Sequence, residues 1–302
     1  YIDADGHYPE RSGIYSGVEN AAFITIARLA NRPSLYAPVR KNLTMYQYYI
    51  EPNGDLVRND SRRQDQYEYA ARTSTLFYLQ YRFIAVHEKN KLFAAICKQI
   101  EATKDFEKDI LTRSFFYFLE DETMQQQLPT ADVLPERYEK LFPTSHLLRI
   151  KEKNTTVTLF GGTDQPLLIA SGRSNSPDFL SYRTGDAILK YMRLSSNFFS
   201  MGYFYSDGLQ KEGNSYVLRK KLENLRKELT HLESRHDEVA HLLDDAFGRD
   251  AHGLVVRQLL DAATLGLAHG FFHGLGDPVG IQNGAPIQVA RRTAYGLDQA
   301  AL

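Results

Sequence analysis

The apolar side chains of this chain change their spacing once, and that change limits the folds that the chain can form. Up to about residue 125 they recur every three or four positions, which is the period of an amphipathic helix. From about residue 146 they fall in short runs separated by turn residues, as in β-strands. Helices gathered in one part and strands in the next predict an α+β multidomain protein.

Helices are expected over most of the first part. They cover residues 18–30, 39–49, 66–86, 92–103 and 106–119. Short connections favour antiparallel neighbours, so residues 1–125 should form hairpins of helices. Between the second and third helices, Pro52-Asn53-Gly54-Asp55 predicts a tight turn.

Strands are expected over residues 126–222. The β-type runs are 146–150, 156–160, 167–170, 179–183, 187–194, 198–205 and 216–222. Turn residues such as Gly161-Gly162 and Thr184-Gly185-Asp186 separate them. Sequential strands joined by short turns predict an antiparallel sheet.

The composition changes again near residue 223. All 14 lysines lie at or before Lys227, and six of the nine histidines lie from His231 to His273. Leucines at helical spacing from Leu222 onward predict a helical tail over 223–302, in which the residues past Gly274 are expected to be loop-like. Its origin stays open between a natural extra domain, a fusion and a translated frame error.

Charge and cysteine content exclude several classes of function. The 36 basic and 37 acidic residues nearly cancel, whereas a general nucleic-acid binder carries a basic surplus. No run approaches 18 consecutive apolar residues, so no membrane-spanning helix is expected. The single cysteine, Cys97, excludes an internal disulfide and a cysteine-based zinc site. We expect no metal and no other cofactor.

Tyrosine is abundant, with 19 residues, and tryptophan is absent. A tyrosine ring can line a sugar groove, because its face covers C–H groups while its hydroxyl forms hydrogen bonds. The same ring can fill a core. Both interpretations stay open for Tyr46, Tyr48 and Tyr49.

Residues 5–15 form the densest group of chemically capable side chains. A glycine-containing loop that leads into a helix carries His7, Glu10, Arg11 and Tyr15. The ordinary pKa of histidine lies near neutrality, which makes His7 a candidate general base. A helix cap with a local salt bridge is the alternative interpretation.

In this loop the sequence resembles the heparinase II/III-like polysaccharide lyases, whose helical domain carries the pattern Asp-Gly-x-x-x-Glu-x-Ser-x-x-Tyr. The corresponding residues are Asp5, Gly6, Glu10, Ser12 and Tyr15. Residues 179–187 look like early β-domain strands of that family. The resemblance covers about residues 1–220 and does not extend over 228–302.

The resemblance implies a particular architecture and location. Residues 1–125 would be the C-terminal part of an α/α toroid, and residues 126–222 part of an antiparallel β-sandwich. The protein would be secreted or periplasmic. An asparagine, or an Asn-His pair, lies well upstream of the family's catalytic tyrosine and would precede Tyr1 here, so we expect a chain truncated at its N-terminal end. Where the family often has a β-domain histidine, this chain has Asn175-Ser176-Pro177-Asp178.

The resemblance also implies β-elimination on uronic-acid polysaccharides. A proton leaves C5 once the adjacent carboxylate is neutralised, a base takes it, and an acid protonates the departing glycosidic oxygen. The match makes Tyr15 the catalytic acid, and also the base if a nearby cation favours its ionised form. Arg11 would bind the carboxylate or act on Tyr15, and Glu10 would orient Arg11.

Two adjacent arginines, Arg62 and Arg63, open the stretch before a predicted helix. Guanidinium groups suit sugar carboxylates because their fork matches the two oxygens. A solvated capping segment is the alternative. We therefore expect a lyase with an acidic polysaccharide as its partner, and neither nucleic acid nor a membrane span. A non-catalytic acidic-glycan-binding protein on the same fold is the second hypothesis, and the oligomeric state stays open.

Overall fold

A computed structural model describes residues 2–67, 74–104, 106–164, 176–194 and 203–220, together with the backbone of 287–293 and 296–299. The chain divides into two compact units. The first consists of Tyr1–Thr144, Leu148–Thr158 and Asp164–Ser176; the second consists of Ser145–Leu147, Leu159–Thr163 and Pro177–Leu302. The helices and the strands up to the third lie mainly in the first unit, and the later strands lie in the second.

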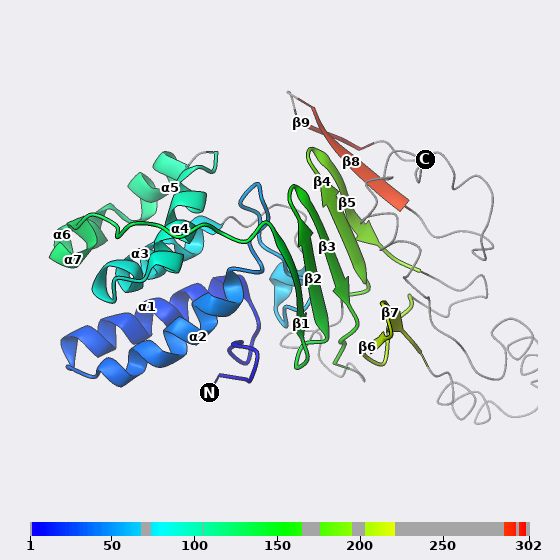
Figure 1. Ribbon diagram of the computed structural model, residues 1–302, viewed down its shortest axis with the longest axis horizontal. Helices are drawn as coiled ribbons and strands as arrows, with labels where there is room; N and C mark the ends of the chain where they lie inside the picture. Colours follow the sequence, from blue (N-terminus) through cyan, green and yellow to red (C-terminus); the bar gives the residue numbers. More distant parts are fainter. Residues whose placement is uncertain are drawn as a thin grey trace, which may run out of the picture. The chain divides into compact units, whose positions relative to one another are not determined.

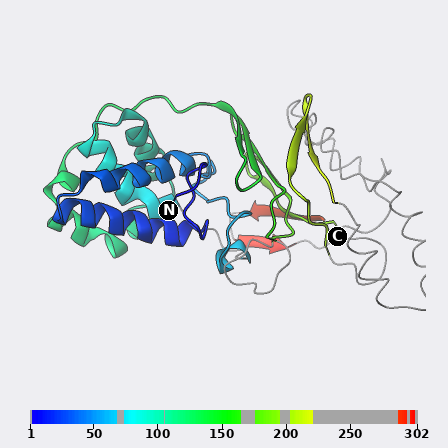
Figure 2. The same ribbon diagram turned by 90° about the horizontal axis from the view of Figure 1, so that it is seen from below.

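The first unit begins with helices, as expected (Figure 1). They are α1 (Gly13–Leu29), α2 (Tyr36–Tyr46), α3 (Tyr78–His87), α4 (Lys91–Glu101), α5 (Phe106–Arg113), α6 (Phe115–Glu120) and α7 (Glu122–Gln125). Short 3-10 helices are η1 (Pro33–Leu35), η2 (Gln64–Tyr67) and η3 (Ser74–Phe77). Helices α1 and α2 lie side by side, and so do α3 and α4 (Figures 1 and 2).

Helix α4 forms where the sequence pattern predicted a helix, because its first turn is capped and its apolar side chains share one buried face. The Asn90 side chain accepts a hydrogen bond from the Phe93 backbone N–H, at 3.0 Å, and so caps the first turn. Phe93, Cys97 and Ile100 follow at helical spacing and are buried. By contrast, the helix expected over 66–86 begins only at Tyr78, because 3-10 turns occupy the described residues before it.

Several tyrosines prove to be core residues. The ring centroid of Tyr46 lies 4.1 Å from that of Phe77, and both rings are buried. Tyr81 is also buried and donates a hydrogen bond of 2.6 Å to the Leu43 carbonyl. A buried tyrosine needs such a partner for its hydroxyl. Of the three tyrosines considered for a sugar groove, Tyr46 and Tyr49 are therefore interior.

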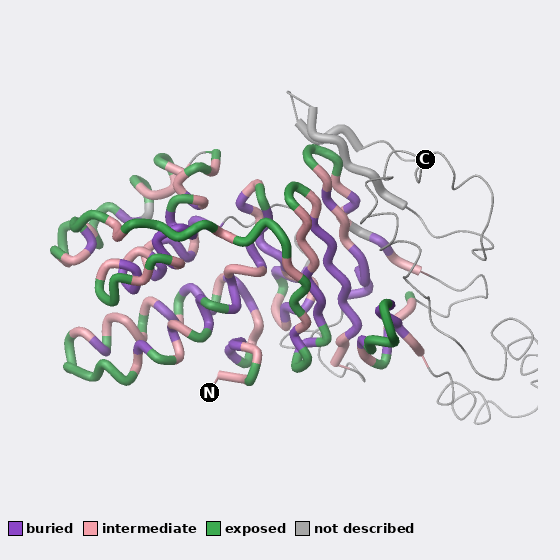
Figure 3. Tube along the Cα trace, viewed as in Figure 1, coloured by how far each residue is buried: buried purple, intermediate pink, exposed green. Residues whose placement is uncertain are grey.

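The strands form an antiparallel sheet, as the short runs predicted. They are β1 (Arg137–Phe142), β2 (Leu147–Glu152), β3 (Thr155–Phe160), β4 (Leu180–Thr184), β5 (Ala187–Met192), β8 (Ile287–Thr293) and β9 (Gly296–Gln299), in the order β1-β2-β3-β4-β5-β8-β9. Strands β6 (Leu209–Glu212) and β7 (Ser215–Leu218) form a separate antiparallel pair. Burial is concentrated along β2 and β3 (Figure 3).

Some strands differ from the expected set. β1 was not expected, because its sequence is charged and most of its residues are at least partly exposed, so it lacks an apolar run. The expected strand 167–170 and most of 198–205 lie outside the described residues. So does 221–286, which holds most of the expected helical tail. The parts of the tail that are described, β8 and β9, are strands, where the sequence predicted loop-like structure.

Gly6 lies in the loop before α1, and its backbone conformation and close neighbours lead to a first prediction. Its φ is +110°, and a Cβ there would lie 2.8 Å from the Lys41 carbonyl oxygen and 3.0 Å from the Met45 Cβ. Gly6→Ala should lower the free energy of unfolding by about 2–4 kcal/mol, because strained backbone adds to a steric clash. Urea unfolding measures this change.

The matched control is Gly17→Ala in the same unit. Gly17 lies inside α1, and a Cβ there would meet only the Leu76 carbonyl oxygen, at 3.6 Å. This variant should be as stable as the wild type or slightly more stable, because alanine favours a helix over glycine. If the two substitutions changed the free energy of unfolding equally, the backbone conformation and close neighbours of Gly6 would not require a glycine there.

Candidate functional site

Tyr15 lies in the first turn of α1, and its side chain meets a guanidinium group. The residue is 38% exposed. Arg63 Nη2 donates a hydrogen bond of 3.0 Å to Tyr15 Oη. The Arg63 Cζ atom lies 4.7 Å from the centroid of the Tyr15 ring. One cation therefore contacts both the hydroxyl and the ring of a solvent-accessible phenol.

Glu10 lies on the other side of the same guanidinium. Its Oε1 atom is 3.6 Å from Arg63 Nη1, which makes an ion pair between partly exposed groups. Screening by solvent keeps the energy of such a pair small. Its effect is to restrict where the Arg63 side chain can lie.

Arg62 joins the loop 5–15 to the segment that carries Arg63. Its backbone N–H donates to the Glu10 carbonyl at 3.0 Å, and its Nη1 donates to the Pro9 carbonyl at 3.0 Å. Its Nε lies 2.9 Å from Asp164 Oδ2. Arg62 thus holds the loop in place. We call Tyr15, Arg63, Glu10 and Arg62 the Tyr15 cluster.

Asp65 is a further residue of the site, and sequence analysis did not single it out. It is buried and accepts hydrogen bonds from Ser12 Oγ, at 2.9 Å, and from Ser61 Oγ. Ser61 Oγ in turn accepts from the Arg63 backbone N–H at 3.2 Å. These bonds anchor the backbone from which the arginines extend. The only signal in the sequence was that Asp65 follows the two arginines closely.

Arg11 occupies a different place from the one expected. Its φ is +50°, and its Nη2 donates to the Thr144 carbonyl at 3.1 Å. The Thr144 backbone N–H donates to Asp5 Oδ2 at 2.7 Å, so this end of the loop is tied to the end of β1. The guanidinium that contacts Tyr15 is that of Arg63, and Glu10 pairs with Arg63 as well. Arg11 remains at the surface of the loop.

His7 points into the interior, away from the Tyr15 cluster's exposed groups. It is 2% exposed, and its Nε2 lies 3.0 Å from Tyr49 Oη and 3.3 Å from Asp60 Oδ2. The Tyr49 hydroxyl donates to the same Asp60 oxygen at 2.6 Å. Burial lowers the pKa of His7, although the Asp60 carboxylate opposes that effect. A general base has to reach its substrate, and this ring is enclosed.

The buried His7 predicts a pH dependence of stability. Its pKa is lowered from 6.5 in the folded state, so the unfolded chain binds this proton more readily. The contribution of His7 is fully present above pH 6.5 and is lost as the pH falls from 6.5 to the folded pKa. The contribution of His7 to the free energy of unfolding should change by no more than about 1.4 kcal/mol per pH unit.

Urea unfolding of wild type and His7→Gln at several pH values tests this expectation. The free-energy difference between the two proteins should shrink as the pH falls below 6.5, because the variant has no proton to bind at this position. The exposed His87→Gln variant is the control. A difference that stays constant with pH would mean that His7 does not remain neutral in the fold.

The described part of the chain shows neither a metal cluster nor a membrane helix. Its His, Cys, Asp and Glu side chains form no group of three or more that could hold a metal ion. Its helices are too short or too polar to cross a bilayer.

Comparison with known proteins adds no family assignment. No family model, no curated protein and no solved structure matches the chain. The function is therefore inferred from the geometry of the Tyr15 cluster and from the motif in residues 5–15.

Proposed function

We propose that this protein is a polysaccharide lyase that cleaves uronic-acid-containing polysaccharide by β-elimination, with Tyr15 as its catalytic residue. The observation that carries the proposal is the contact between Arg63 and the accessible hydroxyl of Tyr15, at 3.0 Å. The architecture proposed with it is the one that the resemblance implies: the helices belong to an α/α toroid and the sheet to a β-sandwich. The location proposed is secreted or periplasmic.

The Arg63 guanidinium can stabilise the negative charge that develops on the Tyr15 oxygen during the reaction. A guanidinium has five donors in a planar fork, and one of them is used on Tyr15. Negative charge on the phenol oxygen during proton transfer is stabilised by the adjacent cation. Arg11, at the surface of the same loop, is available to bind the substrate carboxylate.

The proposed reaction needs one proton carrier. The ionised Tyr15 oxygen takes the proton from C5, and the electron pair of that C–H bond forms the C4–C5 double bond. The C4–O bond breaks, and its electron pair stays on the glycosidic oxygen. Tyr15 then returns the proton to that oxygen, which leaves an unsaturated uronate on one product. This assignment gives Tyr15 both proton transfers and does not use His7.

The second candidate is a non-catalytic protein that binds acidic glycans on the same fold. The enclosed position of His7 favours it, because His7 was the other candidate base and has 2% exposure. In this case Arg11 and Arg63 would hold carboxylates without any proton transfer.

Two assays on the same panel of acidic polysaccharides separate the candidates. Ultraviolet absorbance follows the unsaturated product, and affinity electrophoresis follows binding. Product formation supports the lyase. Retardation without product supports the binding protein, and neither signal with any uronate polymer would contradict both.

A further inference from the structure

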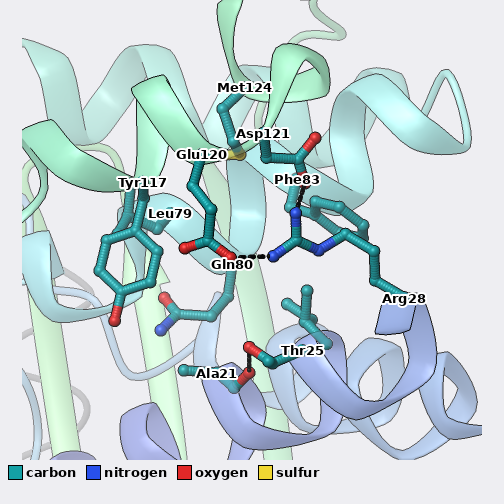
Figure 4. Close-up of a pocket in the computed structure, with 11 residues that line it drawn as sticks. Ala21, Thr25, Arg28, Leu79, Gln80, Phe83, Tyr117, Glu120, Asp121 and Met124 are labelled. Atoms are coloured by element: carbon teal, nitrogen blue, oxygen red, sulfur yellow. Dashed lines mark hydrogen bonds and ion pairs between the residues drawn. The ribbon is translucent and has the colours of Figure 1, made fainter. Parts of the chain in front are cut away.

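The first unit has an open pocket between α1, α3, α6 and α7 (Figure 4). Its volume is about 520 Å³, counting the solvent at its mouth. The apolar lining consists of Ala21, Ile24, Leu79, Phe83 and Met124; the polar lining consists of Thr25, Arg28, Gln80, Tyr117, Glu120 and Asp121. This pocket shares none of its lining residues with the Tyr15 cluster.

Gln80 gives the pocket a buried hydrogen-bond acceptor. The residue is 7% exposed, and its Nε2 donates to the Gly17 carbonyl at 3.1 Å. That bond fixes the orientation of the amide, because the reverse orientation would place two oxygens together. Among the described residues, Oε1 has no hydrogen-bond partner. Figure 4 shows the carboxamide in the pocket, between Ala21 and the Tyr117 ring.

The charged groups at the rim favour a positive ligand. Arg28 Nη2 lies 2.5 Å from Glu120 Oε1, and Arg28 Nη1 lies 3.5 Å from Asp121 Oδ2 (Figure 4). One cation against two carboxylates leaves a formal charge of −1. Tyr117 is 46% exposed, and an aromatic face also attracts a cation.

We infer that this pocket binds a primary ammonium group carried on a short aliphatic chain. The ammonium has three donors and no acceptor, which suits the free Gln80 oxygen and the rim carboxylates. Its methylene groups fit against Phe83 and Met124, which are part of the apolar lining. A hydroxyl would satisfy Gln80 but would not use the negative charge, and a carboxylate would be repelled.

Ligand-observed NMR on the whole chain tests the inference with n-butylammonium as the probe. Saturable binding is expected for this ion, weaker binding for n-butanol, and none for butyrate. Gln80→Leu keeps the size of the side chain and removes the acceptor, so it should weaken n-butylammonium binding about tenfold or more.

Two further variants keep the test decisive. Gln125→Leu is the matched control, because Gln125 is an exposed glutamine of α7 outside the pocket lining, and it should bind as the wild type does. Tyr117→Leu changes only a partly exposed ring and should weaken binding even if Gln80→Leu fails to fold. Equal affinities for n-butylammonium and n-butanol, or wild-type affinity in both pocket variants, would overturn the inference. Neither result depends on lyase activity.

Discussion

Tyr15→Phe is expected to lower the rate of β-elimination by about a thousandfold or more and to leave the fold intact. The substitution removes a single oxygen, which the proposed reaction uses for both proton transfers, and such transfers contribute about 10²- to 10⁴-fold each. The ring keeps its contact with Arg63, and only a partly exposed hydrogen bond is lost. Stability should therefore change by about 1 kcal/mol or less. Product absorbance and thermal unfolding provide the two measurements.

Two companion variants make the result specific. Tyr117→Phe removes the hydroxyl of another partly exposed helical tyrosine and should keep the wild-type rate. Arg63→Lys keeps the charge but loses the fork that reaches Tyr15, so its rate should fall between those of wild type and Tyr15→Phe. If Tyr15→Phe retained the wild-type rate, Tyr15 could not be the proton carrier.

Arg149→Met is expected to lower the free energy of unfolding by about 3–5 kcal/mol. Arg149 is fully buried, with 0% exposure, and its Nη1 lies 2.8 Å from Glu51 Oε1. Its Nε donates to the Tyr48 carbonyl at 2.9 Å. Burial alone would lower the pKa of Arg149, but Glu51 and Tyr138 raise it on balance, so the guanidinium stays charged. Methionine would fill the space and leave the Glu51 carboxylate buried without its cation.

Two control variants distinguish the loss of stability caused by an unpaired buried charge from the loss caused by poorer packing. The double variant Arg149→Met/Glu51→Leu should recover most of the lost stability, because an apolar pair can replace a buried ion pair at little net cost. Arg137→Met breaks the exposed ion pair with Glu152 and should change stability by about 1 kcal/mol or less. Urea unfolding measures all three. A double variant as unstable as Arg149→Met would place the effect in packing and not in charge.

The motif in residues 5–15 shows what a local sequence pattern can predict and what it cannot. It placed Tyr15 in a loop before a helix over residues 18–30, whereas the structure begins that helix at Gly13, so Tyr15 lies in its first turn. It also suggested that Arg11, four residues before Tyr15, would bind the substrate carboxylate or act on Tyr15. The structure instead brings Arg63 to Tyr15 across 48 positions. The hydrogen bond from Ser12 to Asp65 joins the loop to the segment that carries Arg63, and the spacing of residues within the loop does not reveal this bond.

The periodic spacing of apolar residues and the residues that cap or turn the chain determined where most helices and strands form. The cap of α4 by Asn90 and the runs that became β2 and β3 illustrate this. Such signals depend on neighbours within one turn or one strand, so the sequence carries them directly. Tertiary structure alone decided that His7 is enclosed and Tyr15 accessible. Burial depends on which distant segments pack over a side chain, and here Tyr49 and Asp60 cover His7 while Arg63 leaves Tyr15 open to solvent.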